Sequence, residues 1–445
     1  MLIRFVVSNF LSFNEETEFN MLAGSFRNHK HHVYKTSKLN ILKGAALYGA
    51  NGAGKSNLVK AIDFLQNIID EGKLEKSVNS KKFKLDRKNI DKPIEFEIEF
   101  YYKKKIYVYG ISINGLIIEK EWLYISGIEK EDKLIFERET KINGKSKIKF
   151  LDKYVKTQKY KQLIELFEDN ILRNNETLLG KYDILKITDI NNVNKWIVEK
   201  LVILYPESRF GMLAPVITIA DELAPFINKL LKTFNTGVEK LQIKDVDFDI
   251  YFGKEDKNIK NELLEELSEG RFTFVETENR PVLVTKKNNQ IIVKKVISIH
   301  KDIDNNQIKF DLIEESDGTI RLLDIIPAFY NILNSETTVI IDEIDQSLHP
   351  SLLFNFIKKI MDNETTKGQL IFTTHESNLL DLNIFRQDEI WFAEKNNVGA
   401  TQLYSLSDFK PRYDLDIRKG YLKGRFGAIP FLGDLKKLKW ERDDA

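Results

Sequence analysis

The segment Gly49–Ser56 has the residue types and spacing of a phosphate-binding loop. Its sequence, Gly-Ala-Asn-Gly-Ala-Gly-Lys-Ser, fits the pattern GxxxxGK[ST] at every fixed position. Glycines let backbone N–H groups turn inward around phosphate oxygens, while Lys55 reaches the β- and γ-phosphates and the Ser56 hydroxyl binds Mg²⁺. The pattern therefore predicts ATP and Mg²⁺ as ligands. The residues predicted to contact the nucleotide are Gly49, Asn51, Gly52, Ala53, Gly54, Lys55, Ser56 and Asn57.

The residues on either side of this loop supply the structural context that the motif needs. The apolar run Ala45–Tyr48 predicts a strand before the loop, and Asn57–Ile62 predicts a helix after it. The N-terminus of such a helix adds its dipole and its unpaired N–H donors to an anion site. This context favours a phosphate loop over a glycine-rich turn that matches by chance.

A second group of candidate residues closes the run Thr338–Glu343. A β-branched run that ends in two acids predicts a buried strand with carboxylates at its C-terminal tip. We assign Asp342 to the Mg²⁺ shell with Ser56, and Glu343 to the orientation and polarisation of the attacking water. Taken alone, the run is more simply an apolar strand followed by solvated acids. The phosphate loop upstream favours the functional interpretation.

A third candidate is His375, which ends the predicted strand Ile371–His375. The interval between Asp342 and this strand accommodates a helix over Pro350–Met361, which predicts a parallel βαβ unit. Because parallel strands end at one edge of a sheet, His375 is placed to approach the γ-phosphate as a second catalytic residue. The alternative is a structural histidine.

The turn formed by Ser316, Asp317 and Gly318 precedes a predicted helix. A Ser-x-Gly turn that opens a helix provides an anion-binding N-terminus, although an ordinary N-cap has the same sequence. The order of the motifs favours the anion site. Phosphate loop, Ser-x-Gly helix, Asp-Glu strand and strand-end histidine follow one another along the chain.

This order resembles the ABC-type ATPase heads of the RecF, SMC and OLD group. Glu315–Thr319 resembles the ABC signature, commonly LSGGQ, of which it keeps the serine and the second glycine. Asp345–Pro350 is similar to the D-loop, and Ser8–Phe13 is similar to the NFxSF motif of RecF-like heads. No glutamine lies between Gln66 and Gln158, so the Q-loop residue stays unassigned.

The resemblance implies a composite site, in which two protomers enclose ATP between them. Bound ATP then holds the heads together, and hydrolysis at Glu343 releases them. It implies a homodimer of heads or a higher homo-oligomer. The residues that it assigns to the nucleotide bound by the other protomer are Ser316, Asp317, Gly318, Asp345 and Ser347.

More narrowly, the chain resembles the stand-alone prokaryotic ATPases called "AAA family fifteen", which include RloA and the AriA subunit of the PARIS anti-phage system. The residues on which this resemblance rests are Glu315–Thr319, Asp342–Asp345 and Tyr421–Pro430. The resemblance implies an ATPase sensor or scaffold that controls a separate effector protein, most plausibly a Toprim-type nuclease. The trigger that it implies is DNA or a phage protein. Only 70 residues follow His375, which is too few for the Toprim domain of OLD nucleases. The alternative is a RecF-like DNA-binding ATPase of repair or recombination.

The chain divides into three stretches by composition. Residues 1–150 are expected to form the N-terminal half of an ATPase head with the phosphate loop and a β subdomain, residues 151–240 a helical insertion, and residues 241–445 the C-terminal half. The predicted fold class is α/β, a P-loop ABC-type head with a mixed sheet, flanking helices and an antiparallel β subdomain.

Composition limits the location and the partners. The net charge is +1, from 68 basic and 67 acidic residues, which does not favour nucleic-acid binding over the whole surface. The chain has no cysteine, as is typical of a reducing compartment. No apolar run approaches the roughly 20 residues that span a bilayer, so we expect a cytoplasmic protein without membrane contact.

Three polar clusters have two interpretations each. The Asn28–His32 segment has the side chains for a metal site, but no carboxylate is close in sequence, which favours a polar surface loop. Lys103–Lys105 suits a hairpin tip or a phosphate contact. The C-terminal basic cluster suits either nucleic acid or an acidic partner, or a solvated cap. Its residues are Arg412, Arg418, Lys419, Lys423 and Arg425, with Tyr413, Tyr421 and Phe426 interleaved.

Overall fold

The computed structural model describes residues 1–429, except for 128–130, 142–143, 212, 220–221, 254–255, 276, 278–281 and 413–414. The chain forms two compact units. The first comprises Met1–Ile203, Ser335–Ile344 and Ile357–Ala445, and the second comprises Leu204–Asn334 and Asp345–Phe356. The three-stretch division expected from composition stays a prediction. None of the described helices is both long enough and apolar enough to cross a membrane.

A six-stranded mixed sheet carries the predicted phosphate loop in the first unit. Its order is β11 (Leu201–Leu204), β17 (Thr338–Ile341), β18 (Gln369–Thr373), β5 (Gly44–Tyr48), β19 (Ile390–Lys395) and β20 (Thr401–Ser405). Strands β17, β18, β5 and β19 pair in parallel, whereas β20 is antiparallel to β19. Every residue of β17, β18 and β5 is buried, as expected for a parallel sheet covered on both faces.

The connection between β17 and β18 contains α10 (Pro350–Met361), so the predicted parallel βαβ unit is confirmed. In the register, Ile341 lies opposite Phe372, and Thr373 lies opposite Leu47 of β5. The three strands therefore end at one edge of the sheet. Asp342, Thr374 and Gly49 directly follow them at that edge.

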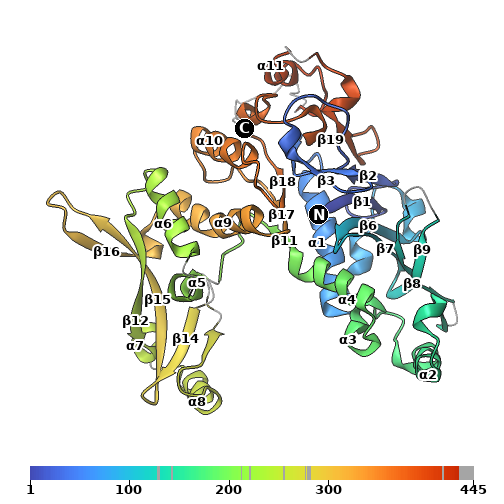
Figure 1. Ribbon diagram of the computed structural model, residues 1–445, viewed down its shortest axis with the longest axis horizontal. Coiled ribbons are helices and arrows are strands. Elements are labelled where there is room, and N and C mark those ends of the chain that lie inside the picture. Colours follow the sequence, from blue (N-terminus) through green and yellow to red (C-terminus); the bar gives the residue numbers. More distant parts are fainter. Residues whose placement is uncertain are drawn as a thin grey trace, which may run out of the picture. The chain divides into compact units, whose positions relative to one another are not determined.

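A seven-stranded antiparallel sheet forms the β subdomain of the first unit. Its order is β10 (Ser146–Phe150), β9 (Lys133–Thr140), β8 (Ile117–Ile125), β7 (Lys105–Asn114), β6 (Ile94–Tyr102), β1 (Leu2–Ser8) and β2 (Thr17–Asn20). Strands β6 to β9 lie side by side in Figure 1. A short hairpin of β3 (Val33–Lys35) and β4 (Asn40–Leu42) is separate. These sheets confirm the predicted fold class, a mixed sheet with an antiparallel subdomain.

The alternating sequence of β6 explains how this subdomain packs. Ile94, Phe96, Ile98 and Phe100 are buried, while the intervening glutamates face outward or lie half-buried. The lysine cluster is a hairpin tip, as predicted: Lys103 and Lys104 have φ values of 49° and 62°, and the next pair is Tyr102 with Lys105. Both tip lysines are exposed.

The helices of the first unit follow the apolar spacing of the sequence. In α1 (Lys55–Glu71), the buried residues Leu58, Ile62, Leu65 and Ile69 recur at three or four positions and form one face. The helix ends at Gly72, where φ is 67°. The remaining helices are α2 (Gln158–Leu166), α3 (Tyr182–Leu185), α4 (Thr188–Lys195) and α11 (Ile417–Leu422).

A buried carboxylate joins the antiparallel sheet to the loop before α3. Glu121 of β8 accepts hydrogen bonds from the backbone N–H groups of Leu178 and Leu179, at 2.7 and 2.9 Å, and from the Tyr109 hydroxyl at 3.1 Å. Arg138 lies 3.7 Å from it. Burial raises the pKa of Glu121, and the Arg138 guanidinium opposes that rise. The two backbone hydrogen bonds fix the segment before α3 against the sheet, to which Tyr109 and Arg138 also belong.

The second unit contains an antiparallel sheet and its own core. Its strands are β12 (Lys240–Asp247), β13 (Phe272–Val275), β14 (Val282–Lys287), β15 (Gln290–Lys301) and β16 (Gln307–Asp311). Its helices are α5 (Leu213–Ile219), α6 (Leu223–Thr233), α7 (Phe248–Phe252), α8 (Lys257–Glu266) and α9 (Asp317–Asn334). Phe248, Leu263, Val284 and Val293 form a buried cluster between these helices and the sheet. Figure 1 shows this unit in green to orange.

The aromatic residues of the C-terminal cluster belong to the core of the first unit. Tyr421 and Phe426 are 8% and 1% exposed, and both rings stack on Phe392 of β19. They are therefore not accessible to nucleic-acid bases. Tyr413 and Pro430 lie outside the described residues.

Candidate nucleotide site

The phosphate loop connects β5 to α1, and its glycines are required by close backbone approaches. At Gly49 a Cβ atom would lie 2.5 Å from the carbonyl oxygen of Ala393, and at Gly54 it would lie 2.0 Å from Oγ1 of Thr401. Gly52 and Gly54 also have φ values of 75° and 110°. Any side chain at Gly54 would displace the loop or the β20 strand.

The loop borders a cavity of about 400 Å³ that contains most of the predicted site residues. Glu343 and His375 line this cavity together with the loop and the first turn of α1. The lining residues of the loop and turn are Asn51, Gly52, Ala53, Gly54, Lys55, Ser56 and Asn57. The structure thus brings the phosphate loop, the predicted base and the strand-end histidine around one space.

Lys55 is 5% exposed and makes several polar contacts within the loop. Its Nζ atom donates to the carbonyl oxygen of Gly49 at 2.9 Å and lies 3.0 Å from Nε2 of His375. The ammonium group donates to that ring nitrogen when Nε2 carries no proton. Lys55 and His375 are therefore paired, and both line the cavity.

Asp342 lies within hydrogen-bonding distance of Ser56. Its Oδ1 atom accepts a hydrogen bond from the Ser56 hydroxyl at 3.2 Å and another from the Thr373 hydroxyl at 2.6 Å. The carboxylate is 3% exposed. A hydroxyl and a buried carboxylate in contact form an oxygen donor set that suits Mg²⁺. The two residues predicted to bind the metal are thus neighbours.

Thr373 is a site residue that the sequence analysis missed. It ends β18, donates to Asp342, and accepts a hydrogen bond from the backbone N–H of Glu343 at 2.8 Å. Glu343 has a φ of 48°, an uncommon conformation that this bond stabilises. One hydroxyl therefore fixes both acids. In the sequence, the one indication of a role for Thr373 was its position directly before Thr374 and His375.

A second polar network, also missed, holds the loop against the N-terminal motif. The Thr401 hydroxyl donates to the Ala53 carbonyl oxygen at 2.8 Å. It also lies 2.8 Å from the Ser12 hydroxyl. Ser12 also accepts a hydrogen bond from the Asn57 side chain at 2.7 Å. This network gives the serine of the NFxSF-like segment a physical role, which is to position the loop and its helix.

The signature-like and D-loop-like residues belong to the second unit. The Ser316 hydroxyl accepts a hydrogen bond from the backbone N–H of Thr319 at 3.2 Å and so caps α9. A Cβ atom on Gly318 would lie 2.9 Å from the Ser347 carbonyl oxygen, so these two segments are in contact. Asp317, Asp345 and Ser347 lie on them. Their roles toward a nucleotide stay predictions, as do those of the loop residues and acids.

The only upstream glutamine near the expected Q-loop has another role. Gln66, in α1, donates to the carbonyl oxygens of Ile197 and Leu201, both at 2.6 Å. It therefore fixes the helical segment to α1. The Q-loop residue stays unassigned.

Residues 45–381 match a protein family described as "AAA domain, putative AbiEii toxin, Type IV TA system". The match extends from β5 to beyond His375 and covers more than half of the chain. The chain belongs to this AAA family. It is thus a protein of the AAA ATPase class, in agreement with the coarser sequence prediction. No curated protein sequence matches the chain.

Three solved structures are distantly similar. The SMC head domain from Thermotoga maritima is 12% identical, with a TM-score of 0.40, over 91% of this chain and 98% of the other. An SMC head bound to the C-winged helix domain of ScpA is 12% identical, with a TM-score of 0.46, over 92% and 99%. An Smc head with an extended coiled coil, bound to the C-terminal domain of ScpA derived from Pyrococcus furiosus, is 14% identical, with a TM-score of 0.40, over 92% and 97%.

Replacing Thr373 with valine tests the role of its hydroxyl. Thr373→Val keeps the volume but removes the donor to Asp342 and the acceptor for the Glu343 N–H. Because residues that orient a metal ligand typically contribute a factor of about 10–100, the Mg²⁺ concentration for half-maximal ATP binding is expected to rise by about tenfold or more. Titration of fluorescent ATP binding with Mg²⁺ measures it. Thr373→Ser is the matched control and should behave as the wild type; equal Mg²⁺ dependence in Thr373→Val would contradict the assignment.

Proposed function

We propose that this chain is an ATP-hydrolysing ABC-type ATPase whose heads assemble when ATP is bound. The observation that carries the proposal is the shared cavity, which the phosphate loop, Glu343 and His375 line together while Asp342 lies under Ser56. A loop that only bound nucleotide would need neither a carboxylate nor a histidine at this place. Their presence supports hydrolysis.

The geometry supports a role for each residue. The loop N–H groups and Lys55 bind the phosphates, and Lys55 exchanges its contacts with Gly49 and His375 for phosphate oxygens. Ser56 and Asp342 would hold Mg²⁺, which neutralises phosphate charge. Glu343 accepts a proton from the water that attacks the γ-phosphorus, and the bond to the β–γ bridging oxygen breaks. His375 donates a hydrogen bond to the γ-phosphate.

We also propose that the site is completed by a second copy of the chain. Ser316 caps α9 through the Thr319 N–H and therefore lies at a helix N-terminus, where anions bind favourably. The adjoining Gly318 contacts the segment with Asp345 and Ser347. In the ATP-bound assembly, these residues of one protomer contact the γ-phosphate held by Lys55 of the other. Burial of the triphosphate between two binding surfaces favours the dimer.

Glu343→Gln separates binding from hydrolysis. The amide keeps the shape of the side chain but does not accept the proton from water, so we expect ATP binding with a loss of turnover of about 100-fold or more. The variant should accumulate as an ATP-bound dimer, detectable by light scattering. Lys55→Ala should bind no ATP and remain monomeric. Normal turnover by Glu343→Gln would show that another residue is the base.

Mixing two inactive variants tests the composite site. Lys55→Ala disables the phosphate loop, whereas Ser316→Asp keeps an N-cap for α9 but places a negative charge against the γ-phosphate. A mixed dimer has one site with both wild-type halves, so mixing should restore up to about half of the wild-type hydrolysis per dimer at saturating ATP. Each variant alone should be inactive. No gain on mixing would show that one chain supplies the whole site.

For the biological role, we propose a sensor or scaffold that controls a separate effector in anti-phage defence, with a Toprim-like nuclease as the effector class. The resemblance to "AAA family fifteen", including RloA and the AriA subunit of PARIS, motivates this role. The matched family description, which refers to a toxin of a type IV TA system, is in keeping with defence. DNA or a phage protein is the proposed trigger. Affinity purification from phage-challenged cells tests it, because the proposal requires an effector bound in an ATP-dependent manner.

The second candidate function is a RecF-like DNA-binding ATPase. The exposed tip lysines Lys103 and Lys104 favour it, since they can contact phosphates. If this function holds, duplex DNA should stimulate ATP hydrolysis, and the affinity for DNA should fall steeply with salt. Lys103→Glu with Lys104→Glu should then reduce the salt slope by about two. Absence of any DNA effect at low salt would eliminate this candidate.

A further inference from the structure

Three histidines of the segment before β3 form a compact group. One ring nitrogen from each of His29, His31 and His32 lies within 4.8 Å of the others. The rings of His29 and His32 stack with centroids 4.7 Å apart, and those of His31 and His32 meet edge to face at 4.4 Å. The sequence-based interpretation as a polar surface loop is wrong for His32, which is 1% exposed. Its carboxylate partner, Glu389, is far away in sequence.

Hydrogen bonds determine which nitrogens remain for a ligand. Nε2 of His29 lies 2.9 Å from the carbonyl oxygen of Leu382, and a carbonyl only accepts, so this nitrogen carries the proton and Nδ1 keeps a lone pair. Nδ1 of His32 lies 2.9 Å from a carboxylate oxygen of Glu389, which leaves Nε2. A carbonyl and a carboxylate are the usual partners of the outer nitrogen of metal-binding histidines.

Several polar atoms around the group have no hydrogen-bond partner among the described residues. They are Nε2 of His31, Nε2 of His32 and both polar side-chain atoms of Asn28, all of them buried. Buried polar groups without a partner are rare in native proteins, and a bound ion or water is a common explanation. His32 is the decisive residue, because its side chain is almost fully buried and one nitrogen is already occupied.

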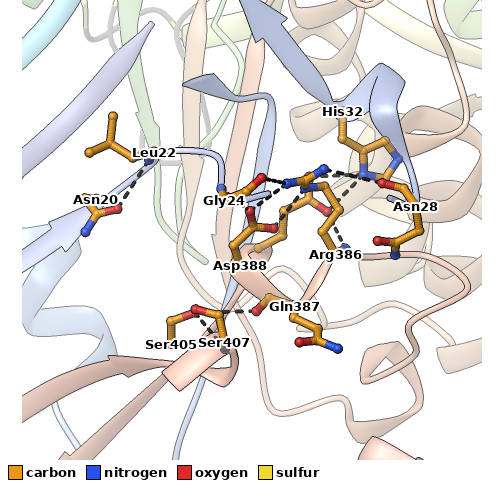
Figure 2. Close-up of polar contacts among 11 residues, drawn as sticks. Asn20, Leu22, Gly24, Asn28, His32, Arg386, Gln387, Asp388, Ser405 and Ser407 are labelled. Atoms are coloured by element: carbon orange, nitrogen blue, oxygen red, sulfur yellow. Dashed lines mark hydrogen bonds and ion pairs between the residues drawn. The ribbon is translucent and has the colours of Figure 1, made fainter. Parts of the chain in front are cut away.

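A buried ion pair holds the histidine segment in place. Arg386 binds Asp388 through two nitrogens, at 2.9 and 2.7 Å, and also donates to the carbonyl oxygens of Gly24 and Asn28. Figure 2 shows Arg386 with Asp388 and Gly24 on one side and with Asn28 and His32 on the other. Since these contacts fix the backbone directly before the histidine segment, binding an ion requires little ordering there.

We propose that His29, His31 and His32 bind a zinc ion through Nδ1 of His29 and Nε2 of His31 and His32. Three imidazoles suit zinc, and water would occupy the fourth, open position. With Zn–N bonds of about 2.0 Å, tetrahedral ligand nitrogens lie about 3.3 Å apart, so nitrogens that now lie within 4.8 Å of one another move closer when the ion binds. Glu389 and the Leu382 carbonyl would orient two of the rings.

The position of the group indicates what the ion would do. The backbone N–H of Lys43 donates to the His32 carbonyl oxygen at 2.8 Å, and Lys43 directly precedes β5. Glu389 directly precedes β19, the parallel neighbour of β5. The ion would thus join the starts of two strands, at the edge opposite the phosphate loop. Its effect should be on stability, independent of the proposed hydrolysis.

Zinc binding can be measured on the full-length protein after dialysis against EDTA. We expect one equivalent of ZnCl₂ to bind in calorimetric titration and to raise the Tm. His31→Gln should weaken zinc binding by at least about tenfold and abolish the rise in Tm, because it removes one ligand from a half-exposed position. His29→Gln should do the same. His300→Gln, a histidine of the second unit, is the control and should bind zinc as the wild type does.

Two results would contradict the proposed zinc site. One is a stripped wild-type protein that takes up no stoichiometric zinc and whose Tm does not change. The other is His31→Gln and His29→Gln binding zinc as tightly as the wild type. In either case water, not zinc, satisfies the buried nitrogens. ATP binding by the zinc-free protein distinguishes this outcome from a failure of the nucleotide site.

Discussion

The candidate site depends on the parallel register of β17, β18 and β5. The ends of these parallel strands are paired, so the residues that follow them lie at one edge of the sheet. Asp342, Thr373 and the phosphate loop are therefore neighbours at that edge. The Thr373 hydroxyl then fixes the positions of both acids, because it donates to Asp342 and accepts from the Glu343 N–H. A shift of one residue between β17 and β18 would separate the two acids from this hydroxyl.

The loop itself depends on how closely β19 and β20 approach it. The Ala393 carbonyl and the Thr401 hydroxyl occupy the space that side chains at Gly49 and Gly54 would need. Thr401 also contacts Ser12, which links the mixed sheet to the start of the antiparallel sheet through one hydroxyl pair. The phosphate loop is therefore held by segments from both ends of the chain.

The sequence predicted the parts whose signal is local. The phosphate loop, the buried strand before Asp342 and the βαβ unit each follow from spacing within a few residues, and the structure contains all three elements. The roles of Thr373, Thr401 and Ser12 could not be predicted, because each depends on a partner from a different strand. The burial of His32 was missed for the same reason, since Glu389 supplies its carboxylate.

Lys55 connects the phosphate loop to the segment that follows β18. A buried ammonium needs hydrogen-bond acceptors, and the Gly49 carbonyl and the His375 ring nitrogen supply them. Lys55 begins α1, whereas His375 lies two residues after the end of β18. One ammonium group therefore joins the first turn of the helix, the loop before it and the end of a neighbouring strand, beside the cavity that Lys55 and His375 both line.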